Sequence, residues 1–111
     1  MDVPFKGQAK EPPYLPGGVG PEEAANPDIQ SVCDAVKPDF LKRSAVNATK
    51  FKAVKYKSQT VAGYNYFIKV WLGGTQYCHL RIYKPLPHTG GKPRLDSYQM
   101  GKTEHDAITH F

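Results

Sequence analysis

Hydrophobic and polar positions follow two different periods along this chain, and the period changes once. In the first half, apolar residues recur every three to four positions, as on one face of an α-helix: Ile29, Val32, Cys33, Val36 and Phe40. From Phe51 onward, apolar and polar residues alternate, as they do in strands that bury one face. The pattern therefore predicts one helix followed by several strands.

The residues around the helical stripe indicate where the helix begins and how it runs. Asn26 is a favourable N-cap, Pro27 fits the first helical position, and Asp28 lies at the positive end of the helix dipole. Pro38 lies inside the stripe and removes one backbone hydrogen bond, so we expect a kink there rather than an end. A helix with one apolar stripe is suited to cover one face of a sheet.

The alternating half of the chain divides into four predicted strands: 51–58, 64–72, 76–84 and 94–99. In the first strand the apolar phase slips by one position between Ala53 and Val54, which predicts a bulge. The sequence Gly73-Gly74-Thr75 predicts a turn between the second and third strands. One helix and an antiparallel meander make an α+β fold, with a single helix packed across a four- to five-stranded antiparallel sheet.

Two connections between the predicted strands contain apolar residues where a polar turn is usual. The first is the segment 59–63, and the second contains Leu86 between Pro85 and Pro87. Because consecutive antiparallel strands alternate in direction, we expect both connections at the same end of the sheet. An exposed apolar tip lowers solubility unless something covers it. We therefore expect the two tips to form a wedge that fits the cleft of a partner.

Composition and charge narrow the class of protein. The 111 residues are enough for one domain with a modest core, and shares of 40% hydrophobic and 23% charged residues are typical of soluble globular proteins. The net charge of +5 permits attraction to acidic surfaces. Residues 1–13 lack any period and are predicted to be a disordered extension of a domain at 14–111. The chain begins without the apolar stretch of a secretory signal, so we expect a cytoplasmic protein, with the nucleus as a second location.

Candidate catalytic and metal-binding residues lack the arrangement that such chemistry needs. Cys33 lies inside the helical stripe, away from any base that would activate its thiol. We interpret Cys33 and Cys78 as small buried apolar residues, which can pair only if the fold brings them together. The four histidines show no metal-ligand spacing, and Glu104 and Asp106 beside His105 make a poor acid–base pair in a polar tail. We expect no enzymatic activity, no cofactor and no metal.

A second interpretation uses the lysines of the first two strands. Basic and aromatic residues interleave there, as on a platform that stacks nucleic-acid bases: Lys52, Lys55, Lys57 and Lys69, with Tyr56, Tyr66 and Phe67. The same alternation is typical of a solvated sheet face. A basic sheet module that binds nucleic acid or an acidic protein therefore stays open as the alternative function.

The order of these features resembles the cystatin family, and within it the intracellular stefins (type 1 cystatins), the stefin B branch above all. Segment 59–63 has the pattern Gln-x-Val-x-Gly, His79-Leu80-Arg81 and Leu86-Pro87-His88 follow at stefin spacing, and Pro16-Gly17-Gly18 precedes the helix. The resemblance covers residues 16–111. It implies a cystatin-like fold and reversible, competitive inhibition of papain-like cysteine proteases, the cathepsins of types B, H, L and S.

The resemblance also assigns roles by position. It implies that an N-terminal trunk and two hairpin loops enter the active-site cleft of the protease as a wedge: Leu15, Pro16, Gly17 and Gly18; Gln59, Thr60, Val61, Ala62 and Gly63; and Leu86, Pro87 and His88. Two positions depart from the stefin pattern. Tyr64 stands where stefins usually carry a small hydroxyl residue, so a bulky ring lies beside the first loop. Pro16 stands where stefin B-like proteins carry a cysteine, so dimerisation through that thiol is not expected.

The first hairpin also suggests a second oligomeric state. If the hairpin straightens, its two strands merge and the first half of the chain exchanges between two protomers, as family members do. Such an exchange would bury the inhibitory loop. We therefore expect a monomer that can convert to a domain-swapped dimer.

Overall fold

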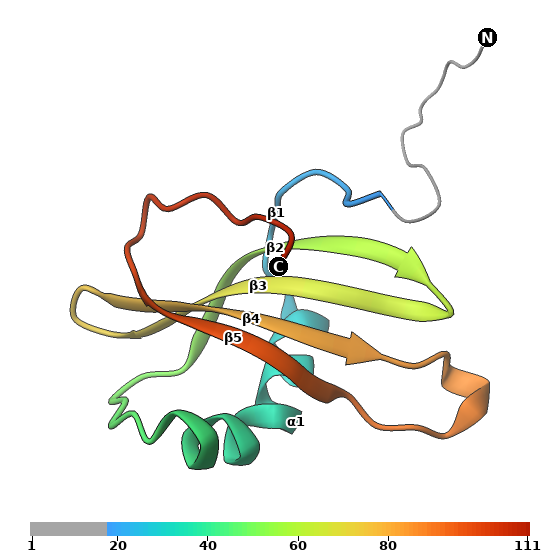
Figure 1. Cartoon of the computed structure of the whole chain (residues 1–111), viewed down its shortest axis with the longest axis horizontal. Coiled ribbons are helices and arrows are strands. Elements are labelled where there is room, and N and C mark those ends of the chain that lie inside the picture. The colour runs from blue at the N-terminus through green and yellow to red at the C-terminus, as the bar shows by residue number, and fades with distance from the viewer. Residues whose placement is uncertain (1–17) are drawn as a thin grey trace, which may run out of the picture.

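The computed structural model describes residues 18–111, which form a five-stranded antiparallel sheet crossed by one helix (Figure 1). Its elements are β1 (Glu23–Ala24), α1 (Pro27–Ser44), β2 (Lys52–Val61), β3 (Gly63–Gly73), β4 (Gln76–Lys84), the short 3-10 helix η1 (Pro87–Thr89) and β5 (Arg94–Lys102). The strands lie in the sheet in the order of the sequence. The predicted α+β fold is confirmed, with five strands in the sheet.

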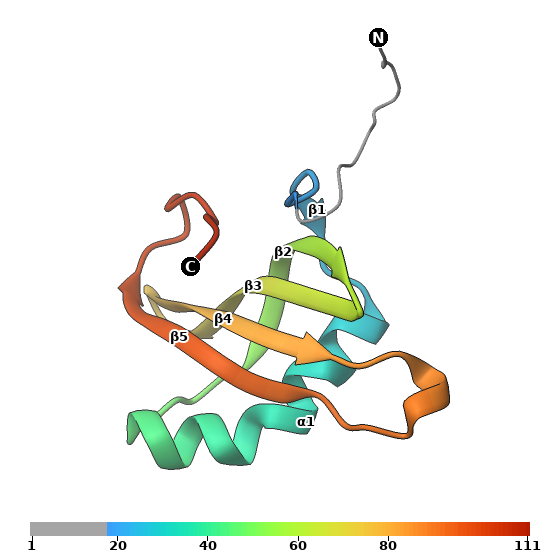
Figure 2. The same ribbon diagram turned by 45° about the vertical axis from the view of Figure 1, so that its right-hand side comes forward.

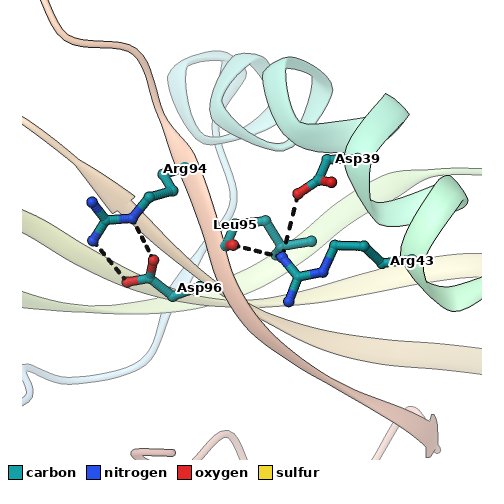
Figure 3. A network of polar contacts seen from close by, with 5 residues as sticks. All are labelled: Asp39, Arg43, Arg94, Leu95 and Asp96. Atoms are coloured by element: carbon teal, nitrogen blue, oxygen red, sulfur yellow. Dashed lines mark hydrogen bonds and ion pairs between the residues drawn. The ribbon is translucent and has the colours of Figure 1, made fainter.

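Helix α1 begins where its capping residues predict. The side chain of Asn26 accepts a hydrogen bond from the backbone nitrogen of Ile29 at 2.9 Å, which satisfies one of the free donors of the first turn. The helix continues through Pro38, so the proline does not end it. Near the other end, Nη1 of Arg43 donates to the carbonyl oxygen of Leu95 on β5 at 2.8 Å and fastens the helix to the sheet (Figure 3).

The helical stripe and one face of the sheet form a single core. All five stripe residues are buried, and they pack with alternate residues of the strands: Ala53, Ile68, Val70, Leu72, Cys78, Leu80, Ile82 and Leu95. The pairing of β2 with β3 shifts between Ala53 and Lys55, which confirms the predicted bulge. Cys33 and Cys78 are free cysteines in this core, and burial raises the pKa of the Cys78 thiol to about 12. They are buried apolar residues, as predicted, and not reactive thiols.

Strand β1 is an element that the hydrophobic pattern does not predict. It is two residues long and pairs with Tyr56 and Lys55 of β2. Ahead of it, Val19 forms a bridge with Gln59 near the far end of β2. The N-terminal segment therefore lies along β2, with Val19 near the hairpin that joins β2 to β3 and β1 farther from it.

The segment that follows β5 covers the sheet face opposite α1, and we call residues 103–111 the C-terminal strap (Figures 1 and 2). Phe67 is fully buried, and its ring centroid lies 5.8 Å from that of Phe111. Lys69 is only 4% exposed, and its Nζ donates to the carbonyl oxygen of Glu104 at 2.5 Å. The interpretation of Lys69 as part of a solvated face is therefore wrong, because the strap lies over it.

Within the part of the chain that the structure describes, no helix has both the length and the hydrophobicity needed to cross a lipid bilayer.

Candidate functional site

The connection between β2 and β3 is tighter than the sequence analysis predicts. Val61 and Gly63 are paired across the hairpin, so Ala62 alone lies between the two strands. Gln59 and Thr60, which we expected in the loop, belong to β2. The tight reversal is possible because Gly63 has a φ of 116°, a conformation that residues with a side chain rarely adopt.

The five residues of the motif differ in burial. Thr60, Val61 and Ala62 are exposed, and 40% of Val61 is open to solvent. Gln59 is only 8% exposed, and its side-chain oxygen accepts a hydrogen bond from Nδ2 of Asn65 at 2.9 Å. Gln59 therefore holds the base of the hairpin together, whereas the three residues after it form the accessible tip.

The second connection, between β4 and β5, is closed by local hydrogen bonds. The hydroxyl of Thr89 donates to the carbonyl oxygen of Leu86 at 2.7 Å, and the backbone nitrogen of Thr89 donates to the same oxygen at 3.1 Å. Leu86 is half-buried, while Pro87 and His88 are exposed. The loop thus presents Pro87 and His88 on a turn that its own residues stabilise.

The two connections lie at the same end of the sheet and contact each other, as the alternation of strand directions predicts (Figure 1). A Cβ atom on Gly63 would overlap the carbonyl oxygen of Lys84 and lie 3.0 Å from Cα of Pro85. Only glycine fits at this contact. We call the residues at the tips of the two loops the loop edge: Thr60, Val61, Ala62, Leu86, Pro87 and His88.

The predicted N-terminal trunk is described only at its end. Gly18 is half-buried and directly precedes Val19, which forms the bridge with Gln59. The backbone nitrogen of Gly20 donates to the carbonyl oxygen of Ser58 at 2.8 Å. Gly18 therefore lies close to the motif. Leu15, Pro16 and Gly17, together with the extension predicted at 1–13, lie outside the described residues.

Tyr64, the unusual residue beside the first loop, is 38% exposed. Its ring stacks on that of Tyr66, with centroids 5.7 Å apart and planes 19° apart. Tyr66 in turn contacts Tyr56 edge to face, with centroids 6.0 Å apart. The row of rings holds Tyr64 beside the tip and leaves part of its surface accessible.

Tyr83 is the residue of this region whose role the sequence pattern does not predict. Its hydroxyl donates a hydrogen bond to the carbonyl oxygen of Ala62 at the tip of the first hairpin. Strand alternation predicts the inward residues of β4 and leaves Tyr83 on the outward face, where a tyrosine is unremarkable. One feature of the sequence could have indicated this role: Tyr83 carries a hydroxyl group near the end of the predicted strand 76–84, at the same end of the sheet as the apolar tip 59–63.

The other candidate groups do not form a second site. Among residues 18–111, no cluster of histidine, cysteine, aspartate and glutamate has the arrangement to hold a metal ion. His79 is fully buried; desolvation, together with the charges of Lys102 and Lys69, lowers its pKa to about 4. Asp106 accepts a hydrogen bond from the backbone nitrogen of Thr103 at 2.7 Å, which lowers the pKa of that carboxyl and closes the first turn of the strap.

Comparison with known proteins places the chain in a family. Residues 17–105 match the family described as Cystatin domain. Cystatin-A1 and Leukocyte cysteine proteinase inhibitor 1, both from Sus scrofa, are each 41% identical to it over 97 residues, which cover 87% of this chain and 94% of the relative. Cystatin-B from Pan troglodytes is 38% identical over 95 residues, which cover 86% of this chain and 97% of that protein. The chain belongs to the cystatin family.

The relatives also define the subfamily. They include cystatins of both the A and the B type, at 41% and 38% identity. The resemblance to stefins, the type 1 cystatins, is therefore confirmed, although these identities do not set the stefin B branch apart from cystatin A. As a member of a family of protease inhibitors, the chain is not an enzyme.

Proposed function

We propose that the chain is a reversible, competitive inhibitor of papain-like cysteine proteases. The loop edge supports this proposal: two hairpin turns lie in contact at one end of the sheet, and their tips are accessible. A relative of 41% identity is named a cysteine proteinase inhibitor. In the proposed complex, Leu15 to Gly18 and the loop edge enter the active-site cleft together, while Gln59 and Gly63 shape the first hairpin.

The geometry of the first hairpin explains why a protease would be inhibited by the tip and would not cleave it. Val61 and Gly63 are paired on either side of Ala62, so the backbone at the tip is folded back on itself and is not extended as in a substrate. Loops that are already formed lose little conformational entropy on docking. A nanomolar complex needs about −12 kcal/mol. An interface of roughly 800 Å² per partner is the usual size for protease–inhibitor complexes.

The proposal predicts stoichiometric inhibition. When the full chain is added to papain whose active sites have been counted, activity should fall linearly to zero at one inhibitor per enzyme. Higher substrate concentration should restore activity, because the inhibitor and the substrate compete for one cleft. A chain that leaves papain fully active at large molar excess would refute the proposal. Parallel titrations against cathepsins B, H, L and S would then rank its targets.

The boundaries, location and oligomeric state belong to the same proposal. The inhibitory domain spans residues 14–111, preceded by an extension at 1–13. The chain acts as a monomer in the cytoplasm, and also in the nucleus. Truncation before residue 14 tests the domain boundary, and imaging of a tagged chain tests the location.

The tight first hairpin leads to a prediction about domain swapping. Because only Ala62 separates β2 from β3, straightening the tip would merge them into one strand and exchange β1, α1 and β2 between protomers. After mild heating, size-exclusion chromatography should resolve a dimer that does not inhibit papain and a monomer that does. A dimer that inhibits as strongly per protomer as the monomer would contradict this prediction.

The alternative, a basic sheet module for nucleic acid or an acidic protein, has less support. Phe67 is fully buried and Lys69 is 4% exposed, so neither is available on a stacking platform. Lys55 is engaged with Glu22, with Nζ 3.3 Å from a carboxylate oxygen. The cystatin relatives do not favour this function either.

A further inference from the structure

Tyr83 connects the two hairpins of the loop edge. It lies near the end of β4, paired with Asn65 of β3 on one side and with Arg94 of β5 on the other. Its hydroxyl donates a hydrogen bond to the carbonyl oxygen of Ala62, the single residue between β2 and β3. A side chain from the second hairpin therefore holds the backbone at the tip of the first.

The ring of Tyr83 is contacted by Arg94, which is itself held by Asp96. The guanidinium carbon of Arg94 lies 4.9 Å from the ring centroid, within the range of a cation–π contact. Arg94 donates two hydrogen bonds to Asp96, from Nε to Oδ1 at 2.6 Å and from Nη2 to Oδ2 at 3.4 Å (Figure 3). The fork-like pairing orients the guanidinium plane. We call the chain of contacts from Asp96 through Arg94 and Tyr83 to the Ala62 carbonyl the tyrosine clamp.

We infer that Tyr83 is a positioning residue, which fixes the Ala62 carbonyl, and with it the exposed tip, before any protease is bound. Ala62 is the one residue between two paired strands, and its own side chain is a methyl group that is exposed to solvent. The hydroxyl of Tyr83 supplies an anchor from a different hairpin. A tip fixed in this way loses less conformational entropy on docking. The effect on inhibition rests on the proposed function, whereas the clamp in the free chain does not.

The test is Tyr83→Phe in the full chain, which removes the hydroxyl and keeps the ring. In the free protein, the backbone order parameters of Ala62 and Gly63 from nitrogen-15 relaxation should fall from rigid toward flexible values. The denaturant midpoint of unfolding should fall only slightly, because one exposed hydrogen bond is lost and the core is unchanged. With papain, the dissociation rate constant should rise about three- to tenfold, the range for one hydrogen bond, with little change in association.

Two further variants isolate the clamp. Tyr77→Phe removes a hydroxyl from the same face of β4 at the opposite end of the strand, and it should leave the order parameters and the dissociation rate unchanged. Asp96→Asn loosens the hold on Arg94 and should raise the dissociation rate less than Tyr83→Phe does, because this ion pair is exposed. In the Tyr83→Phe background, Asp96→Asn should add nothing, since Asp96 acts through the ring.

The possible results separate the clamp from the proposed function. Unchanged order parameters at Ala62 and Gly63 in Tyr83→Phe would overturn the clamp, whatever papain does. If they fall while dissociation from papain is unchanged, the positioning role in binding is overturned. If the wild-type chain does not bind papain, the proposed function fails, and the order parameters still decide whether the clamp exists.

Discussion

Replacing Gly63 by arginine should weaken the inhibition of papain by at least 100-fold, which corresponds to about 3 kcal/mol of binding free energy. Two effects act together at this position. Gly63 has a φ of 116°, so any side chain introduces backbone strain of about 1–3 kcal/mol. A Cβ atom would also overlap the carbonyl oxygen of Lys84 and press against Pro85, so the two hairpins must separate. Because both tips enter one cleft in the proposed complex, separating them removes the fit.

The measurement is the inhibition constant of Gly63→Arg against papain, with circular dichroism to confirm that the fold is retained. The matched control is Gly74→Arg in the turn between β3 and β4. Gly74 also has a positive φ, 54°, but a Cβ atom there meets nothing within 4 Å. The control adds the same charge, also at a positive φ, at the opposite end of the sheet, so it should inhibit as the wild type does. A folded Gly63→Arg variant with wild-type affinity would show that the tips do not act together.

The periodicity of the sequence was enough to predict the parts of the fold that depend on local pattern. The N-cap Asn26, the buried helical stripe and the bulge after Ala53 each produce a signal within a few residues. The placement of both hairpin tips at one end of the sheet then follows from strand order alone. These features position the candidate site, so its location could be predicted before its geometry was known.

The C-terminal strap and strand β1 depend on contacts between distant segments, so the local sequence indicates them only weakly. The strap covers Phe67, and its own buried residue is Ile108, which lies among mostly polar residues with no period to reveal it. Phe67 and Trp71 on the outward face of β3 were the available signal, since apolar residues on both faces of a strand indicate that both are covered. Alternation cannot predict strand β1 either, because two residues are too few to alternate.

The five residues of the motif have different structural roles, which the resemblance to stefins does not distinguish. Similarity identified residues 59–63 as one functional unit, but it did not say how each residue acts. The structure divides them: Gln59 is bonded to Asn65 inside the hairpin, Gly63 permits the turn, and the tip between them is exposed. The role of Tyr83 depends on where a single hydroxyl points, which follows from register and not from local sequence.

His79 should make the folded state less stable in mild acid. His79 lies on β4, paired with Lys69 of β3 and Gln99 of β5, and its side chain is fully buried. Desolvation and the positive charges of Lys102 and Lys69 disfavour a further positive charge more than the nearby Asp106 and Glu22 favour it. The pKa of His79 is accordingly lowered from 6.5 to about 4.

The sign of the effect follows from the number of protons bound in each state. Between pH 6.5 and pH 4 the unfolded chain binds a proton on His79 that the folded chain does not, so stability falls as the pH is lowered through this range. Well above pH 6.5 His79 is neutral in both the folded and the unfolded chain, so it does not lower the stability of the fold. The total loss by pH 4 is about 3 kcal/mol, a large part of the 5–15 kcal/mol that is typical of a small domain.

Urea unfolding at pH 7.5 and at pH 4.5 measures most of this loss, and His79→Gln should remove the greater part of the measured difference. Glutamine keeps a polar side chain at the position but does not titrate. The matched control is His105→Gln, which removes an exposed histidine from the strap and should retain the wild-type difference between the two pH values. If His79→Gln loses as much stability in acid as the wild type does, the acid sensitivity arises from other groups. If the prediction holds, protonation of one imidazole under the strap links mild acid to the stability of the whole sheet.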